Sequence, residues 1–266
     1  MYIPYQQIAE NLGLEEEDIL LIASDISKLA YTTFKNKEKL NSNFLVDSFK
    51  NKLKKGTLLF PAFIDGFKSG DTFDKLSDSP EMGALSKLTF QRVDFLRTSD
   101  PLHSFMVYGK DADDLAEMKS DSTFGPASVF EYLKNKKAKM LLIDVDLEHS
   151  FTFAHYVEEC MKVPYRQYVS LDYKSVNDDR VTVDEKLKVY SKKKGVVNTL
   201  NKLEPILIEK GAMGKIELNE SVFRLIHLDG AYDVICDDIQ KNKAQNLHAF
   251  ELKNFIRSSV KQLIGK

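Results

Sequence analysis

The sequence predicts an α/β protein with a central mixed, largely parallel sheet flanked by helices. Two observations support this fold class. Short apolar runs of strand length alternate with segments of helical spacing between Ile19 and Val145, an order typical of strands joined by crossover helices. The apolar runs are also continuous, as expected for strands that are buried on both faces of a sheet.

The predicted strands are apolar runs that end at polar residues or at glycine. They cover residues 19–24, 57–63, 105–109, 139–145 and 215–218. Helical spacing predicts helices over residues 44–55, where Gly56 is a suitable stop, over 129–136, and over 243–263 at the C-terminal end. Residues 1–266 contain no low-complexity linker, internal repeat or shift of composition, so we expect one domain. Its chemistry-bearing part is residues 1–170, and residues 171–266 form a less informative C-terminal part.

The composition excludes several classes of protein. Hydrophobic residues make up 43% of the 266 residues and charged residues 29%, near globular averages, which excludes disordered and collagen-like chains. With 38 basic against 40 acidic residues the net charge is −2, so no overall positive field attracts nucleic acid, and no nucleic-acid partner is expected. No apolar window reaches the ~18 residues of a membrane span, and no export signal begins the sequence.

The two cysteines, Cys160 and Cys236, form no CxxC pair, which fits reduced thiols in the cytoplasm. We expect Cys160 to be a small core residue, because it lies about 140° around a helix from His155. No metal is expected, since His149, His227 and His248 lack a second ligand at metal-binding spacing.

The most informative segment follows the apolar run that ends near Val145. If a helix begins with Thr152 at or near its N-cap, His155 and Glu158 share one face and Glu159 lies close by. An imidazole beside a carboxylate is a general-base arrangement, because the carboxylate fixes the tautomer and stabilises the imidazolium. The same spacing is also common in exposed ion pairs of no catalytic role, which is the alternative interpretation.

Two other polar segments are candidates for ligand binding. The loop from Arg97 to Ser104 holds many donors and acceptors, and Pro101 favours an extended Asp100. It either binds a phosphate or a polar substrate, or uses its hydroxyls to satisfy its own backbone. The turn from Ser24 to Ser27 follows the first strand and can receive an anion. It has no glycine-rich fingerprint, which argues against Rossmann and Walker sites, and no Gly-x-Ser-x-Gly elbow of a serine hydrolase is present.

Taken in order, seven short motifs resemble the aminoglycoside 3-N-acetyltransferase family, whose fold is distinct from that of the GNAT acetyltransferases. The motifs are LIASDISKL at 21–29, GTLLFPAF at 56–63, SPEMGAL at 79–85, RTSDPLHS at 97–104, FGPAS at 124–128, TFAHYVE at 152–158 and VPYR at 163–166. The resemblance is strong over about residues 5–170. The sequence departs from the family pattern at Asp100, where relatives have His or Asn, and at Ala23 and Asp25, which flank Ser24.

The resemblance implies transfer of an acetyl group from acetyl-CoA, without a metal, to a primary amine of an amino sugar, a nucleotide-linked amino sugar or an aminoglycoside. His155 is then the general base, Glu158 orients it, with Glu159 or Asp146 as alternatives, and the Thr152 hydroxyl and nearby backbone N–H groups stabilise the oxyanion. The candidate CoA contacts are Ser24, Ser27, Arg97, Thr98 and Ser104, and the candidate substrate contacts are Asp65, Asp100, His103, Asp146 and Glu159. We expect a monomer or a homodimer.

The balance of acids and bases favours an amino-sugar or nucleotide-sugar acceptor over a polycationic aminoglycoside. Two other functions stay open. One is a catalytically degenerate relative that binds CoA or a sugar without turnover. The other is a hydrolase that uses His155, Asp146 and water.

Overall fold

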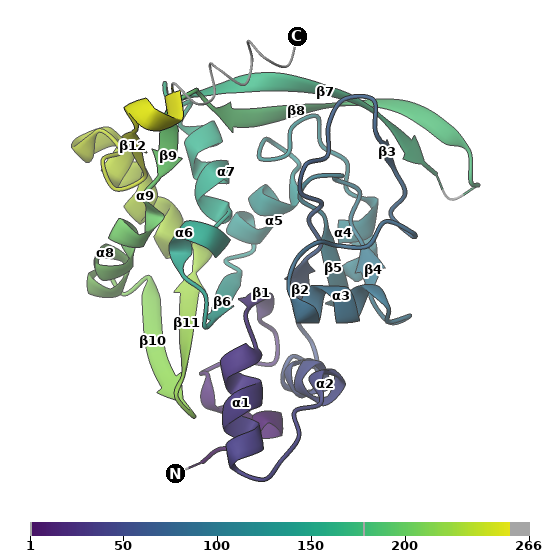
Figure 1. Cartoon of the computed structure of the whole chain (residues 1–266), viewed down its shortest axis with the longest axis vertical. Helices are drawn as coiled ribbons and strands as arrows, with labels where there is room; N and C mark the ends of the chain where they lie inside the picture. The colour runs from purple at the N-terminus through teal and green to yellow at the C-terminus, as the bar shows by residue number, and fades with distance from the viewer. Residues whose placement is uncertain (1, 178, 256–266) are drawn as a thin grey trace.

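The computed structural model describes residues 2–177 and 179–255. Within them the main sheet has seven strands in the order β10-β11-β6-β1-β2-β5-β4 (Figure 1). The three central strands, β6 (Lys139–Ile143), β1 (Ile19–Ser24) and β2 (Thr57–Pro61), are parallel. The outer strands are antiparallel to their neighbours; they are β5 (Phe105–Gly109), β4 (Leu96–Arg97), β11 (Ser221–His227) and β10 (Met213–Leu218). The predicted α/β class with a mixed sheet is confirmed, and its parallel part is the centre.

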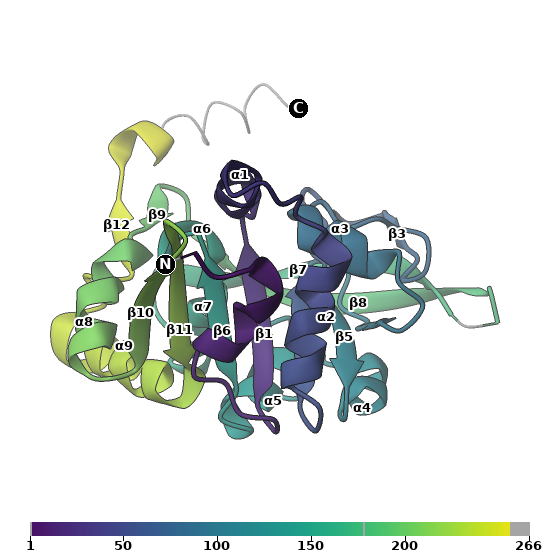
Figure 2. The ribbon, with the colours of Figure 1, turned by 90° about the horizontal axis from the view of Figure 1, so that it is seen from below.

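Helices cover both faces of this sheet (Figure 2). Leu20 and Leu58 point to one face, against a set of helical elements that comprises η1 (Tyr5–Gln7), η2 (Ala9–Asn11), α1 (Ser27–Lys35), α2 (Ser42–Lys52) and α3 (Ala84–Phe90). Leu21 and Leu59 point to the other face, against α4 (Ala112–Glu117), α5 (Val129–Asn135), α6 (Leu147–Ser150), α7 (Phe153–Cys160), α8 (Leu203–Glu209) and α9 (Leu228–Asn242). Alternate side chains of each strand therefore bury into two separate cores, which explains the continuous apolar runs.

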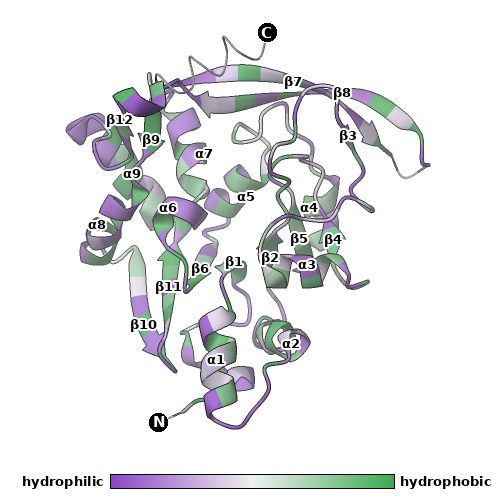
Figure 3. Ribbon diagram, in the orientation of Figure 1, coloured by the Kyte–Doolittle hydropathy of each residue, from purple (hydrophilic) through white to green (hydrophobic). Residues whose placement is uncertain are grey.

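A long hairpin crosses one end of the molecule (Figure 1). Its strands, β7 (Arg166–Val176) and β8 (Thr182–Lys192), pair over their full length, and β3 (Thr72–Phe73) adds to β7. Figure 3 shows hydrophilic and hydrophobic residues mixed along this hairpin, in contrast to the hydrophobic β1 and β2. Because the hairpin lacks a continuous apolar run, the sequence did not predict these strands.

The predicted strands agree with the structure to within about two residues at each end. The helix predicted over 243–263 is wrong over residues 243–251, whereas residues 252–255 are helical as predicted. Helix α9 ends at Asn242, and Lys243 and Ala244 then have φ angles of 54° and 58°. The chain turns there and forms β12 (His248–Phe250), which pairs with β9 (Val196–Asn198). Residues 256–263 of the predicted helix lie outside the described residues. The prediction for Cys160 is also wrong, because its position at the end of α7 exposes it.

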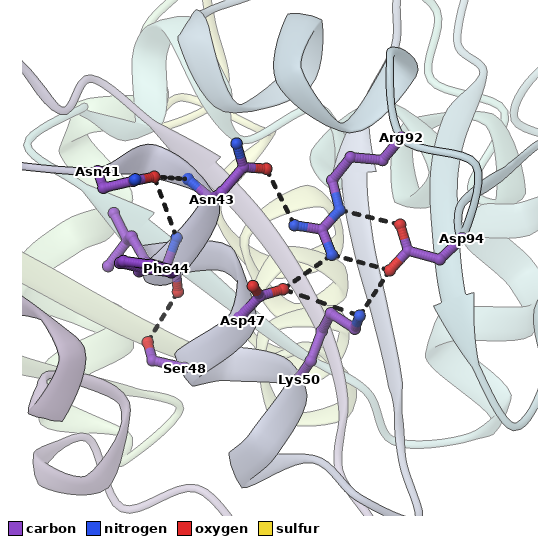
Figure 4. Close-up of polar contacts among 9 residues, drawn as sticks. Asn41, Asn43, Phe44, Asp47, Ser48, Lys50, Arg92 and Asp94 are labelled. Carbon is purple, nitrogen blue, oxygen red and sulfur yellow. Dashed lines mark hydrogen bonds and ion pairs between the residues drawn. The ribbon is translucent and has the colours of Figure 1, made fainter.

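Ionic contacts fasten α2 to the loop before β4 (Figure 4). Asn41 caps the helix by accepting from the N–H groups of residues 43 and 44. Arg92 donates to both carboxylate oxygens of Asp94 and also to Asp47 on α2, and Lys50 contacts the same two aspartates. The hydrogen bonds from Arg92 outweigh the effect of burial, so the pKa of the Asp94 carboxyl lies well below its ordinary value. This network holds α2 against the far edge of the sheet.

No helix in the described ranges, 2–177 and 179–255, is both long and apolar enough to cross a membrane.

Candidate active site

His155 and Glu158 form a close pair on α7. Thr152 is the N-cap of this helix, as predicted, and the i,i+3 spacing brings Nδ1 of His155 to 2.7 Å from Oε2 of Glu158. The carboxylate is 1% exposed and the imidazole 16%. This pair is therefore not a solvated surface pair. His149 and Asp146 show what that alternative looks like, because they have the same spacing and distance but the histidine is 80% exposed.

Glu158 has two further partners that come from the chain after α7. The hydroxyl of Tyr165 donates to Oε1 at 2.8 Å, and Nε of Arg166 forms an ion pair with Oε2 at 2.7 Å. Burial alone would raise the carboxyl pKa, but the hydrogen bond from His155, the charges of His155 and Arg166 and the Tyr165 hydroxyl hold it below the ordinary value. Glu158 is thus kept as a carboxylate in a buried place.

Arg166 also reaches His155 itself. Its Nη2 lies 2.7 Å from Nδ1 of the imidazole, and its Nη1 donates to the backbone carbonyl of Tyr190. Burial, followed by the charge of Arg166, lowers the pKa of His155, so the ring is neutral at neutral pH. When Nδ1 carries the proton it donates to Glu158, and the lone pair then lies on Nε2, 3.5 Å from Nη2 of Arg166.

The sequence analysis included Tyr165 and Arg166 in the motif at 163–166 but assigned no role to either residue. A physical signal for them exists, because a buried glutamate needs compensating donors and a positive charge. The nearest arginine that follows α7 in the chain is Arg166.

Asp146 and Glu159, the alternatives for orienting His155, have other partners. Asp146 accepts from His149 and from Asn201. Glu159 is buried and accepts from Ser122 at 2.7 Å and Tyr168 at 3.3 Å. Burial raises the pKa of Glu159. Of the three carboxylates, Glu158 is therefore the one in hydrogen-bonding contact with the imidazole.

At the start of α7, the backbone donors proposed for the oxyanion are partly used. The N–H groups of Ala154 and His155 donate to the carbonyls of Phe151 and Thr152. The side chain of Thr152 makes no capping hydrogen bond to α7, and the residue is partly exposed. The hydroxyl of Thr152 is thus not used to cap α7.

A row of rings links the ends of two central strands. Phe63, which follows β2, packs at 4.7 Å against His103, and His103 lies 4.9 Å from Phe124. Phe124 in turn packs edge-on at 5.7 Å against His155, which follows β6. Burial lowers the pKa of His103 to about 3, so this ring is also neutral. Within the described residues its Nδ1 has no hydrogen-bond partner.

A pocket of about 420 Å³ lies beside this row of rings. Its lining includes Asp100 and His103 from the loop before β5 and Tyr173 from the β7–β8 hairpin. Its charged lining residues are balanced in sign; they are Lys75, Lys119, Lys186, Asp100, Asp121 and Glu185. Burial raises the pKa of Asp100. His155 does not line the pocket but touches Phe124, which touches His103.

The loop from Arg97 to Ser104 satisfies its own backbone, which is the alternative weighed for it above. Arg97 is 5% exposed and donates to Ser104 and to the carbonyls of Ala62 and Asp78. The hydroxyl of Thr98 accepts from the N–H of residue 105, and that of Ser104 donates to Ala62. Asp100 accepts from the N–H groups of residues 102 and 103. Of the predicted CoA contacts in this loop, only Thr98 lines the pocket.

The remaining predicted residues lie apart from His155 in their contacts. Ser24 ends β1 and is partly exposed, with its carbonyl against Gly83. Ser27 is exposed and its N–H donates to Asp25. Asp65 is exposed in the loop after β2, and its N–H donates to Glu81. No cluster of three metal-ligating side chains is found in the described part of the chain.

Comparisons with known proteins agree on the fold and the family. Three solved structures share the fold at 15% sequence identity each. AAC-IIIb in its binary complex with CoASH has a TM-score of 0.76, with 95% of this chain and 99% of that chain covered. The aminoglycoside acetyltransferase AAC(3)-Xa has a TM-score of 0.75, with coverages of 89% and 91%. AAC-VIa bound to sisomicin has a TM-score of 0.72, with coverages of 91% and 99%.

A search of curated proteins finds no match to the sequence. The family model described as aminoglycoside 3-N-acetyltransferase matches residues 21–239, which is most of the chain. The chain therefore belongs to the aminoglycoside 3-N-acetyltransferase family, which transfers acetyl groups from acetyl-CoA.

Proposed function

We propose that this enzyme acetylates a primary amine of an amino sugar or a nucleotide-linked amino sugar, with His155 as the general base. The observation that carries the proposal is the position of His155. Its Nδ1 faces the buried Glu158 carboxylate. Burial and the charge of Arg166 lower the pKa of the imidazole, so the ring is neutral and Nε2 can accept a proton. A base of this kind contributes a factor of about 10²–10⁴ to the rate.

In the proposed reaction, the amine attacks the thioester carbonyl of acetyl-CoA while Nε2 of His155 takes its proton. The imidazolium that forms is stabilised by Glu158. The tetrahedral oxyanion needs a fixed donor, and the Thr152 hydroxyl is the candidate. Collapse of the intermediate breaks the carbon–sulfur bond, and the CoA thiolate leaves with the proton that His155 gives back. The products are the acetylated amine and free CoA.

The preference for an amino sugar rests on the pocket. A polycationic acceptor requires an excess of carboxylates, whereas the pocket lining carries equal numbers of basic and acidic residues. The rings of Phe73, Phe130 and Tyr173 in its walls suit the flat faces of a sugar or a nucleobase. An aminoglycoside is the alternative acceptor, since the relative AAC-VIa binds sisomicin. For CoA, the turn with Ser24 and Ser27 remains our proposed contact.

The test is to incubate the protein with acetyl-CoA and a panel of amino sugars, sugar nucleotides and aminoglycosides while following free thiol. We expect amine-dependent thiol release, with the highest kcat/KM on an amino sugar or sugar nucleotide. His155→Ala is expected to lower kcat about 10²–10⁴-fold. His149→Ala is the matched control, because it removes the exposed histidine of the same spacing and should leave turnover unchanged.

Two other outcomes contradict the proposal. Thermal stabilisation by CoA with no thiol release on any amine indicates a relative that binds without turnover. Thiol and acetate release without an amine indicates hydrolysis. The latter would need water activated by His155, and Asp146 is already bonded to His149 and Asn201.

A further inference from the structure

The ring of Tyr165 lies flat on the ring of His248. The two centroids are 3.6 Å apart and the planes differ by 16°. The same tyrosine donates its hydroxyl proton to Oε1 of Glu158 at 2.8 Å. His248 is therefore separated from the carboxylate that holds His155 by a single side chain.

His248 belongs to a segment, residues 243–250, that we call the C-terminal clamp. It is anchored by Asp238 at the end of α9, whose buried carboxylate accepts from the backbone and side-chain nitrogens of Asn246. Leu247 is fully buried, and its carbonyl accepts from the N–H of Thr199. These contacts fix the clamp on the body of the protein independently of Tyr165.

The ring of His248 is itself oriented within the clamp. Its Nδ1 lies 3.0 Å from the carbonyl of Ala244 and donates to it, which sets the ring plane. The strand that carries it, β12, pairs with β9 through three residues on each strand. The position of the His248 ring is thus set by contacts other than its stacking on Tyr165.

The orientation of Tyr165 matters because Glu158 is buried. A buried carboxylate oxygen that loses its donor is destabilised. Oε1 of Glu158 accepts from the hydroxyl of Tyr165, while Oε2 faces His155 and Arg166. A tyrosine ring held flat on one face and hydrogen-bonded at its tip has one position. Without the stacking partner, the ring can swing, and the carboxylate can rotate away from Nδ1 of His155.

We propose that the C-terminal clamp holds the catalytic carboxylate in place through Tyr165, so that His248 is a positioning residue for acetyl transfer. The clamp lies beyond residues 21–239, the part of the chain that the family model matches. The inference rests on the proposed role of His155.

The experiment is a double-mutant cycle with His248→Ala and Tyr165→Phe, read out as thiol release from acetyl-CoA. We expect His248→Ala to lower kcat about 3–10-fold with the KM for acetyl-CoA unchanged, about the effect of a misplaced base partner. His248→Phe keeps a flat ring and should restore most of the rate. In the Tyr165→Phe background, which lacks the hydroxyl, His248→Ala should have no further effect.

Phe250→Ala is the matched control, because it removes another aromatic ring from β12 and should leave kcat unchanged. Equal losses for Phe250→Ala and His248→Ala would mean that only the stability of the strand matters, which overturns the proposal. So would independent, additive effects in the cycle.

A second readout does not need an acceptor. In an NMR titration, the pKa of the His155 imidazole should fall in His248→Ala, because it loses the oriented carboxylate that raises it. An unchanged His155 pKa in His248→Ala overturns the clamp. Loss of turnover in His155→Ala together with normal turnover in His248→Ala would overturn the clamp alone, whereas full turnover in His155→Ala would overturn the proposed function.

Discussion

Nε of Arg166 lies 2.7 Å from Oε2 of Glu158, the same oxygen that faces Nδ1 of His155. A permanent positive charge thus sits against both members of the proposed catalytic pair. It stabilises the carboxylate and opposes the imidazolium, and all three groups are mostly buried. The protein therefore keeps Glu158 charged and His155 neutral at the same time.

Replacing Glu158 with Gln should damage both stability and turnover. The change leaves the buried guanidinium of Arg166 without its counter-charge, and breaking a buried ion pair in this way costs about 3–5 kcal/mol of unfolding free energy. It also removes the group that stabilises the imidazolium, so kcat should fall by about 10²-fold. Urea unfolding and thiol-release assays measure the two effects.

Glu159→Gln is the matched control. Glu159 is next to Glu158 in the chain and is also buried, but it accepts hydrogen bonds from Ser122 and Tyr168 instead of His155. Its raised pKa already brings the carboxyl closer to the neutral form that Gln imitates. A loss of turnover in Glu159→Gln as large as in Glu158→Gln would contradict the assigned roles.

The pH dependence of kcat/KM should report the charge of Arg166. Because burial and Arg166 lower the pKa of His155 below the ordinary value of about 6.5, the acid limb of the wild-type profile should lie below pH 6.5. Arg166→Gln removes the repelling charge and should move the limb to higher pH. Arg166→Lys keeps the charge and should leave the limb lower than in Arg166→Gln. Identical limbs in the two variants would refute this electrostatic role.

The free energy of unfolding should also depend on pH through His155. A histidine whose folded pKa is lowered contributes stability that is fully present above the unfolded pKa of about 6.5. That contribution is lost as the pH falls from this value through the folded pKa of His155. The unfolding midpoint of the wild-type protein should therefore drop over this range, and the drop should be smaller in His155→Gln.

Arg97→Gln should destabilise the fold without weakening acetyl-CoA binding. The guanidinium is buried, and its hydrogen bonds go to Ser104 and to the carbonyls of Ala62 and Asp78. Burial lowers its pKa to about 10, but it stays protonated at neutral pH. Loss of the hydrogen bonds that the charged Arg97 guanidinium donates should lower the unfolding free energy by roughly 3 kcal/mol. A several-fold rise in the KM for acetyl-CoA, with normal stability, would instead restore the sequence-based assignment of Arg97 to CoA.

Gly56→Ala should be strongly destabilising. A Cβ at this position would lie 2.1 Å from the backbone carbonyl oxygen of Asp18. Because that atom belongs to the backbone, only a shift of the backbone can relieve the clash. We expect a loss of more than about 2 kcal/mol in unfolding free energy. Gly214→Ala, on the exposed edge strand β10, would meet no atom within 4 Å and should change stability by less than about 1 kcal/mol. Equal unfolding midpoints for the two variants would show that the strands separate to admit the methyl group.

Local sequence information was sufficient for the central strands and for the His155–Glu158 pair. Strand β1 was predicted at its observed limits because a continuous apolar run bounded by polar residues has one favourable place, the middle of a sheet covered on both faces. The pair was predictable because two residues three apart on a helix face each other whatever the rest of the fold does.

The C-terminal part was harder to predict, because its structure depends on distant partners. The segment after Asn242 has a helical pattern, yet it turns to bond with Asp238 and to pair with β9. The mixed composition of β7 and β8 gave no strand signal, since these strands pair mainly with each other.

The residue types and spacing of residues 152–158 thus determined that a base and its carboxylate would be neighbours, because helix geometry is local. The chain could not indicate whether this pair was buried or solvated, and His149 with Asp146 shows the other result from the same spacing. Burial, the counter-charge of Arg166 and the stacking of His248 on Tyr165 arise only when segments far apart in sequence pack together. These long-range contacts set the pKa of an imidazole, since desolvation and neighbouring charges depend on what surrounds it in space.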